Sequence, residues 1–491
     1  MGSQYFLKSQ KRGESMQQFL QEVIVVTNDF LWSKLLIIML LASGLFFTFK
    51  SKFFQVRLLK DMFRVLKEGA PDKNGISPFQ AFCISMAARV GTGNITGIAI
   101  AIALGGPGAI FWMWIIAIIG SASSFVESTL AQIYKIKDKD GFRGGPAYYM
   151  EKGLKKRWMG ALFAVLITLS FGIVFNAVQS NTITVAFENS FGTDRLTLGI
   201  IITIAFGIIT FGGIKRIAKL SEYIVVFLAV LYIGVAVFVM LMNITKLPDV
   251  ISLIVGHAFG LEQAAGGAIG AALMNGIKRG LFSNEAGMGS APNAAAAATT
   301  SHPVKQGLVQ ALGVFTSTLV ICSSTAFIIL FSDAYQEPGL SGIELTQASL
   351  STHIGAWASG FLAIMVFLFS FSTLIGNYYY GETNIEFLHT NKAWLFIYRI
   401  CVLAMVIFGS VSKVQLVWDL ADLFMGLMVI VNLIAIFLLS KVAFAALKDY
   451  VKQRKAGKDP VFYKDVLENH EGVECWERSG TEQKTESKNA I

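Results

Sequence analysis

Long apolar segments separated by short polar ones dominate this sequence, and they restrict the chain to a membrane. A helix needs about 20 apolar residues to cross the hydrocarbon core of a bilayer, and about eleven segments meet this length. Charged residues make up only 15% of the chain, against roughly 25% in an average soluble domain. The sequence therefore predicts an all-α integral membrane protein with about eleven transmembrane helices. These helices are expected near residues 31–49, 78–104, 107–134, 158–187, 195–213, 218–242, 264–300, 303–332, 353–388, 393–411 and 414–440.

Lysine and arginine are concentrated in alternate loops, and this pattern predicts the orientation of the chain. Three alternate loops, the one near 135–157 among them, are basic, whereas the loop near 333–352 has three acidic residues and no Lys or Arg. Because basic loops stay in the cytoplasm, residues 1–30 are expected to lie outside the cell and the polar tail, residues 441–491, inside it. These loops also account for the net charge of +9, so no nucleic-acid partner is expected.

Two of the apolar segments contain glycines and charged residues at the depth of the membrane. The second segment is interrupted at 89–97 (RVGTGNITG) and the seventh at 278–289 (KRGLFSNEAGMG). Such irregular backbone is tolerated in a bilayer only where it is buried in protein or lines a cavity. The first break opens one group of five segments (78–242) and the second opens the next five (264–440). Paired breaks of this kind are typical of an inverted-repeat transporter domain with a binding site near the mid-plane.

Each break also has a simpler explanation. Small residues in membrane helices usually serve helix packing, which accounts for Gly97 but not for Arg89 and Asn94 beside it. The stretch 278–289 is alternatively a cytoplasmic loop, although small-residue helix formers flank it on both sides. GTGNITG is unlike a dinucleotide-binding loop, because its third glycine comes one residue late. A broken helix, by contrast, offers free N–H groups to a carboxylate and free carbonyl oxygens to an amine or Na⁺.

Polar residues in other apolar segments are further candidates for a site. Ser372 and Thr373 in the ninth segment either bond back to their own helix, which is the commoner role, or give hard oxygens to a cation. Glu127 is a candidate because ionisable groups within a membrane are usually functional, although such a residue near a helix end also pairs with loop lysines. The four cysteines and five histidines form no ligand cluster, so neither an enzyme nor a metal centre is predicted.

At these positions the sequence resembles the alanine/glycine:cation symporter family, the sodium:amino-acid symporters. The resemblance rests on VGTGNITGIAIAIALGGPGAIFWMW, GGPAYYM, GIKRGLFSNEAGMGSAPNAAA and YYYGETN, and it extends from Phe79 to Leu438. It implies a LeuT-type fold, which is a five-plus-five inverted repeat with a discontinuous first helix in each repeat, here with one extra N-terminal helix. It also implies a multi-pass protein of a bacterial plasma membrane. Such a protein carries a neutral amino acid (glutamine, alanine or glycine) into the cell with Na⁺ by alternating access, without another cofactor.

The resemblance also implies roles for individual residues. The N–H groups of Thr92 and Gly93 would bind the substrate carboxylate, and Gln179 would meet the substrate amine. Arg89 belongs to the same break, and Asn377 would face the substrate side chain. The remaining substrate-site residues that it implies are Phe282, Ser283 and Met288. The implied Na⁺ ligands are the carbonyl oxygens of Ala87, Val90 and Phe369 and the hydroxyls of Ser372 and Thr373.

Asn377 departs from the family pattern. Members that take alanine or glycine tend to carry a bulky Trp at the second position of this stretch, which here reads GNYYYG. Asparagine is smaller and forms hydrogen bonds through its amide. We therefore expect a larger polar substrate, with glutamine the leading candidate.

Other functions compatible with the sequence make different demands. Proton coupling in place of Na⁺ coupling would use Glu127 or Glu285 as the proton carrier. A channel would show a continuous polar lining over several helices, whereas polarity here is concentrated at two breaks. A transporter-like nutrient sensor would normally add a folded signalling domain, and the polar tail is short for one.

Overall fold

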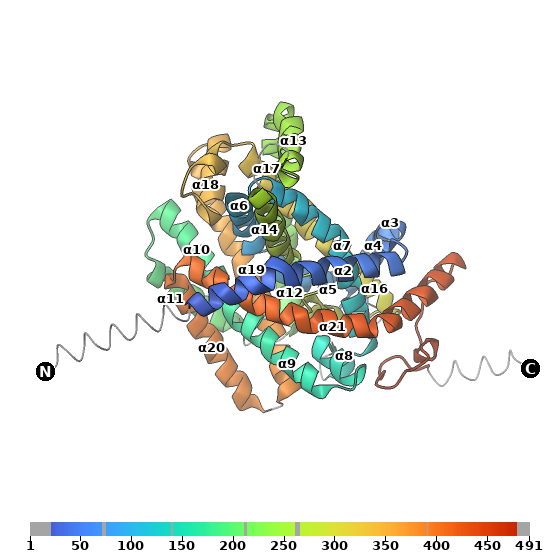
Figure 1. Ribbon diagram of the computed structural model, residues 1–491. Coiled ribbons are helices and arrows are strands. Elements are labelled where there is room, and N and C mark those ends of the chain that lie inside the picture. The colour runs from blue at the N-terminus through green and yellow to red at the C-terminus, as the bar shows by residue number, and fades with distance from the viewer. Residues whose placement is uncertain are drawn as a thin grey trace, which may run out of the picture.

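The computed structural model describes residues 21–70, 75–138, 141–210, 214–260, 266–389 and 391–478. Nearly all of this chain is helical, and the long helices pack together as a bundle (Figure 1). The helices, with π- and 3-10-helical segments marked η, are η1 (Leu31–Leu35), α2 (Leu36–Lys50), α3 (Phe54–Arg57), α4 (Leu59–Leu66), α5 (Pro78–Arg89), α6 (Thr92–Gly105), α7 (Gly108–Ile133), α8 (Pro146–Lys152), α9 (Arg157–Ile167), η2 (Thr168–Phe175), α10 (Asn176–Phe191), α11 (Arg195–Thr210), α12 (Ile214–Met242), η3 (Ile244–Lys246), α13 (Leu247–Ala258), α14 (Gly266–Asn284), α15 (Ala291–Ala297), α16 (Pro303–Phe315), η4 (Thr316–Cys322), α17 (Ser323–Leu330), η5 (Ala334–Gln336), α18 (Gly342–Ile354), α19 (Trp357–Leu388), α20 (Lys392–Val411), α21 (Val414–Lys455) and η6 (Lys464–Val466). A small antiparallel hairpin joins β1 (Ile136–Asp138) to β2 (Gly141–Arg143).

The described part of the chain contains nine of the eleven expected spans by length and hydropathy. Seven single helices are long and apolar enough to cross a membrane, and two bent pairs bring the number to nine. The other two expected spans are α11, which has 16 residues, and the second broken helix. The expected number of eleven membrane helices and their arrangement in two inverted repeats therefore stay predictions.

The first helix begins earlier than the sequence predicted. It runs from Gln21 to Lys50, so residues 21–30 of the expected extracellular segment are helical, and residues 1–20 lie outside the described chain. The buried Asn28 side chain explains the extension, because its amide nitrogen donates to the carbonyl oxygen of Asp419 at 2.9 Å and so ties the added turns to α21.

Both predicted breaks are present. The helices α5 and α6 meet at an angle of 42° across Val90 and Gly91. The second break is shorter than predicted, because α14 stays helical to Asn284 and the chain is irregular only from there to α15. The charged pair at the start of the predicted break remains in the helix because Arg279 and Lys278 both form ion pairs with Asp422 of α21.

Two other elements were not predicted. A sharp bend of 78° separates α12 from the helix that follows it, where Pro248 in the first turn of α13 starts a new helix. The loop predicted near 333–352 contains α18.

At the centre of the bundle, α7 packs against α14 and α16, and α10 packs against α19 and α20. The two halves of the first broken helix lie between these pairs, since α5 contacts α19 and α6 contacts α14.

The tail folds back over one end of the bundle. The helix α21 continues to Lys455, beyond the predicted end of the last span. The segment that follows, residues 456–478, packs on the loops, while residues 479–491 lie outside the described chain. The Phe462 N–H donates to Ser301 O at 2.9 Å, and the Lys305 ammonium binds both Asp459 of the tail, at 2.9 Å, and Glu68, at 2.8 Å. The tail therefore lies on the same side of the bundle as the basic loop between α2 and α5.

Trp476 anchors this segment, and its replacement by alanine is expected to release it. Its ring nitrogen donates to Gln132 O at 2.9 Å, and the Lys135 ammonium lies 4.9 Å from the ring centroid. Truncating a buried tryptophan costs about 3–5 kcal/mol, so residues 456–478 of the variant should be cut faster in limited proteolysis, as mass spectrometry of the fragments would show. Trp158→Ala is the control, because Trp158 is 66% exposed; equal cleavage rates of the two variants would contradict the anchoring role.

Candidate functional site

The first break depends on a close approach that only glycine permits. A Cβ atom on Gly91 would collide with the Thr373 hydroxyl and would lie 2.9 Å from Gln179 Oε1. The glycine N–H is not left without a partner, because it donates to Asn94 Oδ1 at 3.2 Å. The sequence Val-Gly-Thr therefore lets the backbone of one helix touch side chains of two others, α10 and α19.

Five oxygen atoms converge at this break. The Thr373 hydroxyl oxygen lies 2.8 Å from Ala87 O, 3.4 Å from Val90 O and 3.0 Å from Phe369 O. The Ser372 hydroxyl is 2.8 Å from the same Phe369 oxygen. These are the five positions expected to form a Na⁺ site, and all of them are buried. The set consists of neutral carbonyl and hydroxyl oxygens, which are hard ligands suited to Na⁺.

A second polar group forms at the start of α6. Both the N–H and the hydroxyl of Thr92 lie within hydrogen-bonding distance of Gln179 Oε1, at 3.1 and 2.6 Å. The Thr92 hydroxyl is also 3.0 Å from that of Ser370 on α19. The amide oxygen of Gln179 thus takes the position at the helix N-terminus where a substrate carboxylate is expected.

Aromatic rings close this group on one side. The Phe282 ring packs on Gly93, where an added Cβ would lie 2.7 Å from Cδ1 of the ring. Its centroid lies 4.7 Å from that of Phe175 and 4.8 Å from that of Trp418. Ser283, the neighbour of Phe282, accepts from Asn94 Nδ2 at 2.8 Å. The two broken helices are therefore joined directly, by a ring packed on a backbone and by a side-chain hydrogen bond.

Asn377 lies one turn from the proposed Na⁺ ligands on the same face of α19, four residues after Thr373. The residue before it, Gly376, packs on the backbone of Ala88 in α5, where an added Cβ would lie 3.1 Å from Ala88 N. The Asn377 side chain is fully buried, and neither its amide nitrogen nor its amide oxygen has a hydrogen-bond partner among the described residues. A buried amide in this state is rare in folded proteins, which makes Asn377 a candidate for binding a polar group.

Arg89 and Met288 do not join this group. Arg89 reaches the opposite way, donating to Gln310 O of α16 at 3.1 Å and to the Ser124 hydroxyl of α7 at 3.4 Å. Helix geometry explains the difference, because the carbonyl oxygens of Ala87 and Val90 lie at the end of α5, whereas the Arg89 side chain projects roughly 160° around the helix from that of Ala87. Met288 lies within the second break, in the hydrophobic core.

Glu127 holds the second break in place. Its carboxylate accepts hydrogen bonds from Gly287 N at 3.2 Å, Gly289 N at 3.1 Å and Asn432 Nδ2 at 2.8 Å. Both glycines have positive φ, +82° and +86°, which glycine adopts without strain. Glu285 bonds to the Ser290 hydroxyl at 2.6 Å within the same break.

The site contains residues that the sequence analysis did not assign to it. Asn94, Ser370 and Trp418 contact the predicted site residues directly, as given above. Asp422 lies in an apolar segment, where an acidic residue is a functional signal, and it pairs with Arg279.

Comparison with known proteins assigns the family. The model of the sodium:alanine symporter family matches residues 16–464. The probable sodium/glutamine symporter GlnT of Bacillus subtilis (strain 168) is 76% identical over 96% of this chain and 99% of its own length. The sodium/alanine symporter AgcS of Methanococcus maripaludis is 38% identical over 88% of this chain and 98% of its own length. The chain therefore belongs to the sodium:alanine symporter family, which confirms the expected class of Na⁺-coupled amino-acid symporter rather than enzyme.

Solved structures show the fold. MhsT in complex with L-phenylalanine matches 78% of this chain and 99% of its own, with a TM-score of 0.53 at 12% identity. A Na⁺-coupled sialic acid symporter in an outward-open state matches 86% of this chain and 92% of its own, with a TM-score of 0.50 at 16% identity. These likenesses confirm the LeuT-type fold that the resemblance implied.

Proposed function

We propose that this chain carries glutamine into the cell together with Na⁺ by alternating access. The observation that carries the choice of substrate is the fully buried Asn377, whose amide nitrogen and oxygen are both without partners in the described chain. A glutamine side chain ends in an amide of its own, which provides one acceptor and two donors for such a residue. Alanine and glycine have no side-chain polar atom to offer. The relative with 76% identity bears the name of a sodium/glutamine symporter, which supports the same substrate.

The oxygens of the first break support Na⁺ as the coupling ion. A bound ion would hold Ala87 of α5 and Val90, which follows it, to Ser372 and Thr373 of α19, and so fix the start of α6 two residues after Val90. The N–H groups of Thr92 and its neighbour would then point at the substrate carboxylate, and the partial positive charge of a helix N-terminus favours an anion there. Ion and substrate bind cooperatively in this arrangement, because each stabilises the same backbone segment.

The Na⁺ gradient supplies the driving force. Each Na⁺ ion that enters down a membrane potential of 100 mV, inside negative, provides about 2.3 kcal/mol from the potential alone. Since about 1.4 kcal/mol corresponds to a tenfold ratio, the potential alone sustains a large accumulation of substrate. Glu127 is an alternative proton carrier, but it accepts two hydrogen bonds from the second break and one from Asn432 of α21, as expected of a structural role. Coupling to Na⁺ is therefore favoured over coupling to protons.

We infer that the N-terminus lies outside and the tail inside the cell. Contacts between basic loops and the tail support this orientation: Lys305 joins Glu68 to Asp459, and Trp476 packs on Lys135. Loops that touch lie on the same side of the membrane, and the abundance of Lys and Arg makes that side cytoplasmic.

Uptake into proteoliposomes tests the proposed function. Labelled glutamine should accumulate when a Na⁺ gradient is imposed, and excess unlabelled glutamine should block this uptake more strongly than excess alanine or glycine. Uptake driven by a pH gradient in Na⁺-free buffer would instead show proton coupling. If alanine blocks uptake and glutamine does not, the proposed substrate is wrong.

Asn377→Trp is expected to shift preference from glutamine toward alanine. The larger ring fills the space of a substrate side chain and removes the amide that would bind it, so glutamine should lose at least roughly tenfold in transport efficiency, the effect of about 1.4 kcal/mol. The measurement is the ratio of kcat/KM for glutamine and alanine in proteoliposomes. Asn391→Trp, an exposed position at the start of α20, is the control and should leave the ratio unchanged.

A further inference from the structure

A cavity with basic walls lies at the ends of α2 and α21, away from the central site. It has a volume of about 350 Å³ and is lined by residues between 50 and 57 on one side and between 444 and 455 on the other. The first stretch runs from the end of α2 into α3, and the second belongs to α21. The two long helices contact each other and lie side by side (Figure 1). The cavity therefore sits where the first and the last long helices of the chain end together.

Five of the residues that line this cavity are basic, and none is acidic. They are Lys50, Lys52, Arg57, Lys448 and Lys455. All five are exposed, so their charged groups are accessible to a ligand. The guanidinium of Arg57 donates to Ser51 O at 3.1 Å, and none of the four lysines forms an ion pair within the described part of the chain. The cavity thus gathers positive charge that the described chain does not neutralise.

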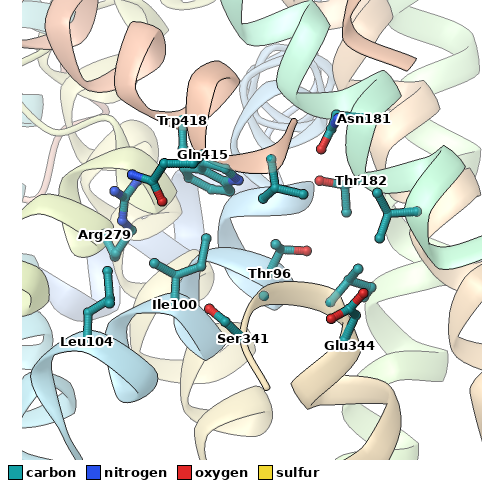
Figure 2. Close-up of a pocket in the computed structure, with 14 residues that line it drawn as sticks. Thr96, Ile100, Leu104, Asn181, Thr182, Arg279, Ser341, Glu344, Gln415 and Trp418 are labelled. Carbon is teal, nitrogen blue, oxygen red and sulfur yellow. The ribbon is translucent and has the colours of Figure 1, made fainter. Parts of the chain in front are cut away.

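Charges elsewhere in the structure are balanced by nearby carboxylates. A smaller cavity, of about 190 Å³, contains Arg279, which pairs with Asp422, and the carboxylate of Glu344 (Figure 2). Near the end of α21, Arg454 pairs with Asp61 at 3.0 Å. The basic cavity differs from these places because no carboxylate lines it. Its charge pattern therefore calls for an anion from outside the chain.

Exposed apolar side chains place the basic cavity at the boundary of the membrane. Phe49 on α2, Phe53 and Val56 in the segment after it, and Leu438 on α21 are all exposed. Apolar surface of this extent is typical of contact with lipid. Lys50, the last residue of α2, follows directly on that surface. The cavity therefore lies at the depth of the lipid headgroups, on the side that the proposed orientation makes cytoplasmic.

The wall formed by α21 combines charge with apolar surface. Phe444, Lys448, Val451 and Lys455 follow one another at spacings of three and four residues, so they share one face of the helix. A soluble anion would use only the two lysines of this face. A molecule with an anionic head and an apolar body would contact all four residues.

From these observations we propose that the basic cavity binds the headgroup of an anionic phospholipid of the inner leaflet. The lipid phosphate lies among the lysines, and the acyl chains run along the exposed apolar residues of α2 and α21. Basic pockets between transmembrane helices on the cytoplasmic side suit such headgroups. The bound lipid joins the added N-terminal helix to the last helix of the domain. This site goes beyond the proposed function, because it does not depend on which substrate or ion the chain carries.

The test measures which lipids stay bound to the purified full-length chain, by native mass spectrometry in an uncharged detergent. The chain is titrated with phosphatidylglycerol or with phosphatidylcholine of the same acyl chains. The wild type should bind phosphatidylglycerol at least about tenfold more tightly, which corresponds to about 1.4 kcal/mol. Excess inorganic phosphate should leave the lipid bound, because it offers the anionic group without the acyl chains.

The triple variant Lys52→Gln/Lys448→Gln/Lys455→Gln removes cations from both sides of the cavity. It should bind phosphatidylglycerol roughly ten- to hundredfold more weakly, because each basic residue near an anionic lipid surface contributes about 1 kcal/mol. Its affinity for phosphatidylcholine should change little. All three positions are exposed, so the variant is expected to fold, and its thermal unfolding checks this.

The matched control is Lys60→Gln/Lys67→Gln/Lys458→Gln. It loses the same charge from three exposed lysines that do not line the cavity, so it should bind both lipids like the wild type. Equal losses in the two triple variants would show general attraction to charge and overturn the site. Equal affinities of the wild type for the two lipids would also overturn it, without reference to any variant. Displacement of the lipid by inorganic phosphate would assign the cavity to a soluble anion instead.

Discussion

Thr373→Val should nearly abolish Na⁺-driven uptake. The hydroxyl of Thr373 lies within 3.4 Å of the carbonyl oxygens of Ala87, Val90 and Phe369, so it contacts three of the other four proposed ligands. Valine has the same shape, which matters because the hydroxyl sits against Gly91. Losing a polar contact to a charged group costs about 1.5–3 kcal/mol, which corresponds to a roughly ten- to hundredfold lower affinity for Na⁺.

The measurement is the Na⁺ concentration that gives half-maximal uptake, together with the thermal stability of the purified protein. The half-saturating Na⁺ concentration should rise roughly ten- to hundredfold, while the protein remains folded. Thr383→Val is a matched control on the same helix, because the Thr383 hydroxyl is also buried but bonds only back to Tyr379 O, at 2.8 Å. An unchanged Na⁺ dependence of Thr373→Val would show that the ion binds elsewhere.

The residues of the proposed Na⁺ site were implied by the family resemblance, and the fold shows why they lie together. Ala87 belongs to the last turn of α5 and Val90 follows its end, while Phe369, Ser372 and Thr373 share a face of α19 at three- and four-residue spacing. Once the glycine break brings those two helices together, all five positions meet. The first break was predictable from local sequence, since glycine and polar residues cannot continue a helix in lipid.

Other features depend on partners far along the chain, and local sequence does not show them. Arg89 neighbours two proposed Na⁺ ligands in sequence but faces α7 and α16, because the direction of a side chain follows the turn of its helix. The predicted second break began too early because Lys278 and Arg279 look costly in a membrane until Asp422, more than 140 residues later, is known to pair with both. The sequence of the tail is polar, yet Trp476 anchors residues 456–478 to the loops through its hydrogen bond to Gln132 O.

Glu127→Gln should destabilise the protein strongly, and this is the largest effect on folding that we expect from one substitution. The carboxylate of Glu127 is fully buried and accepts from two backbone N–H groups and from Asn432. A glutamine amide has one oxygen and one NH₂ group, so at least one of these donors would face another donor. Removing one partner from such a buried charged network costs about 3–5 kcal/mol. Nearby Arg89 would also lose an opposite charge with which it interacts.

The same variant distinguishes a brace from a proton carrier. Glutamine resembles a protonated glutamate, so if Glu127 carried the coupling proton, the variant would stay stable and lose only the dependence of uptake on pH. If Glu127 braces the second break, the variant unfolds at a clearly lower temperature and loses uptake at every pH. Glu382→Gln is the control, because Glu382 pairs with Arg399 at 3.0 Å with its side chain 17% exposed, and a pair that reaches solvent contributes only about 0–1 kcal/mol. Thermal unfolding of the two purified variants therefore decides between the two roles of Glu127. Similar unfolding temperatures would favour a proton carrier. A lower unfolding temperature of Glu127→Gln alone would favour a structural role and, with it, coupling through Na⁺ at the first break.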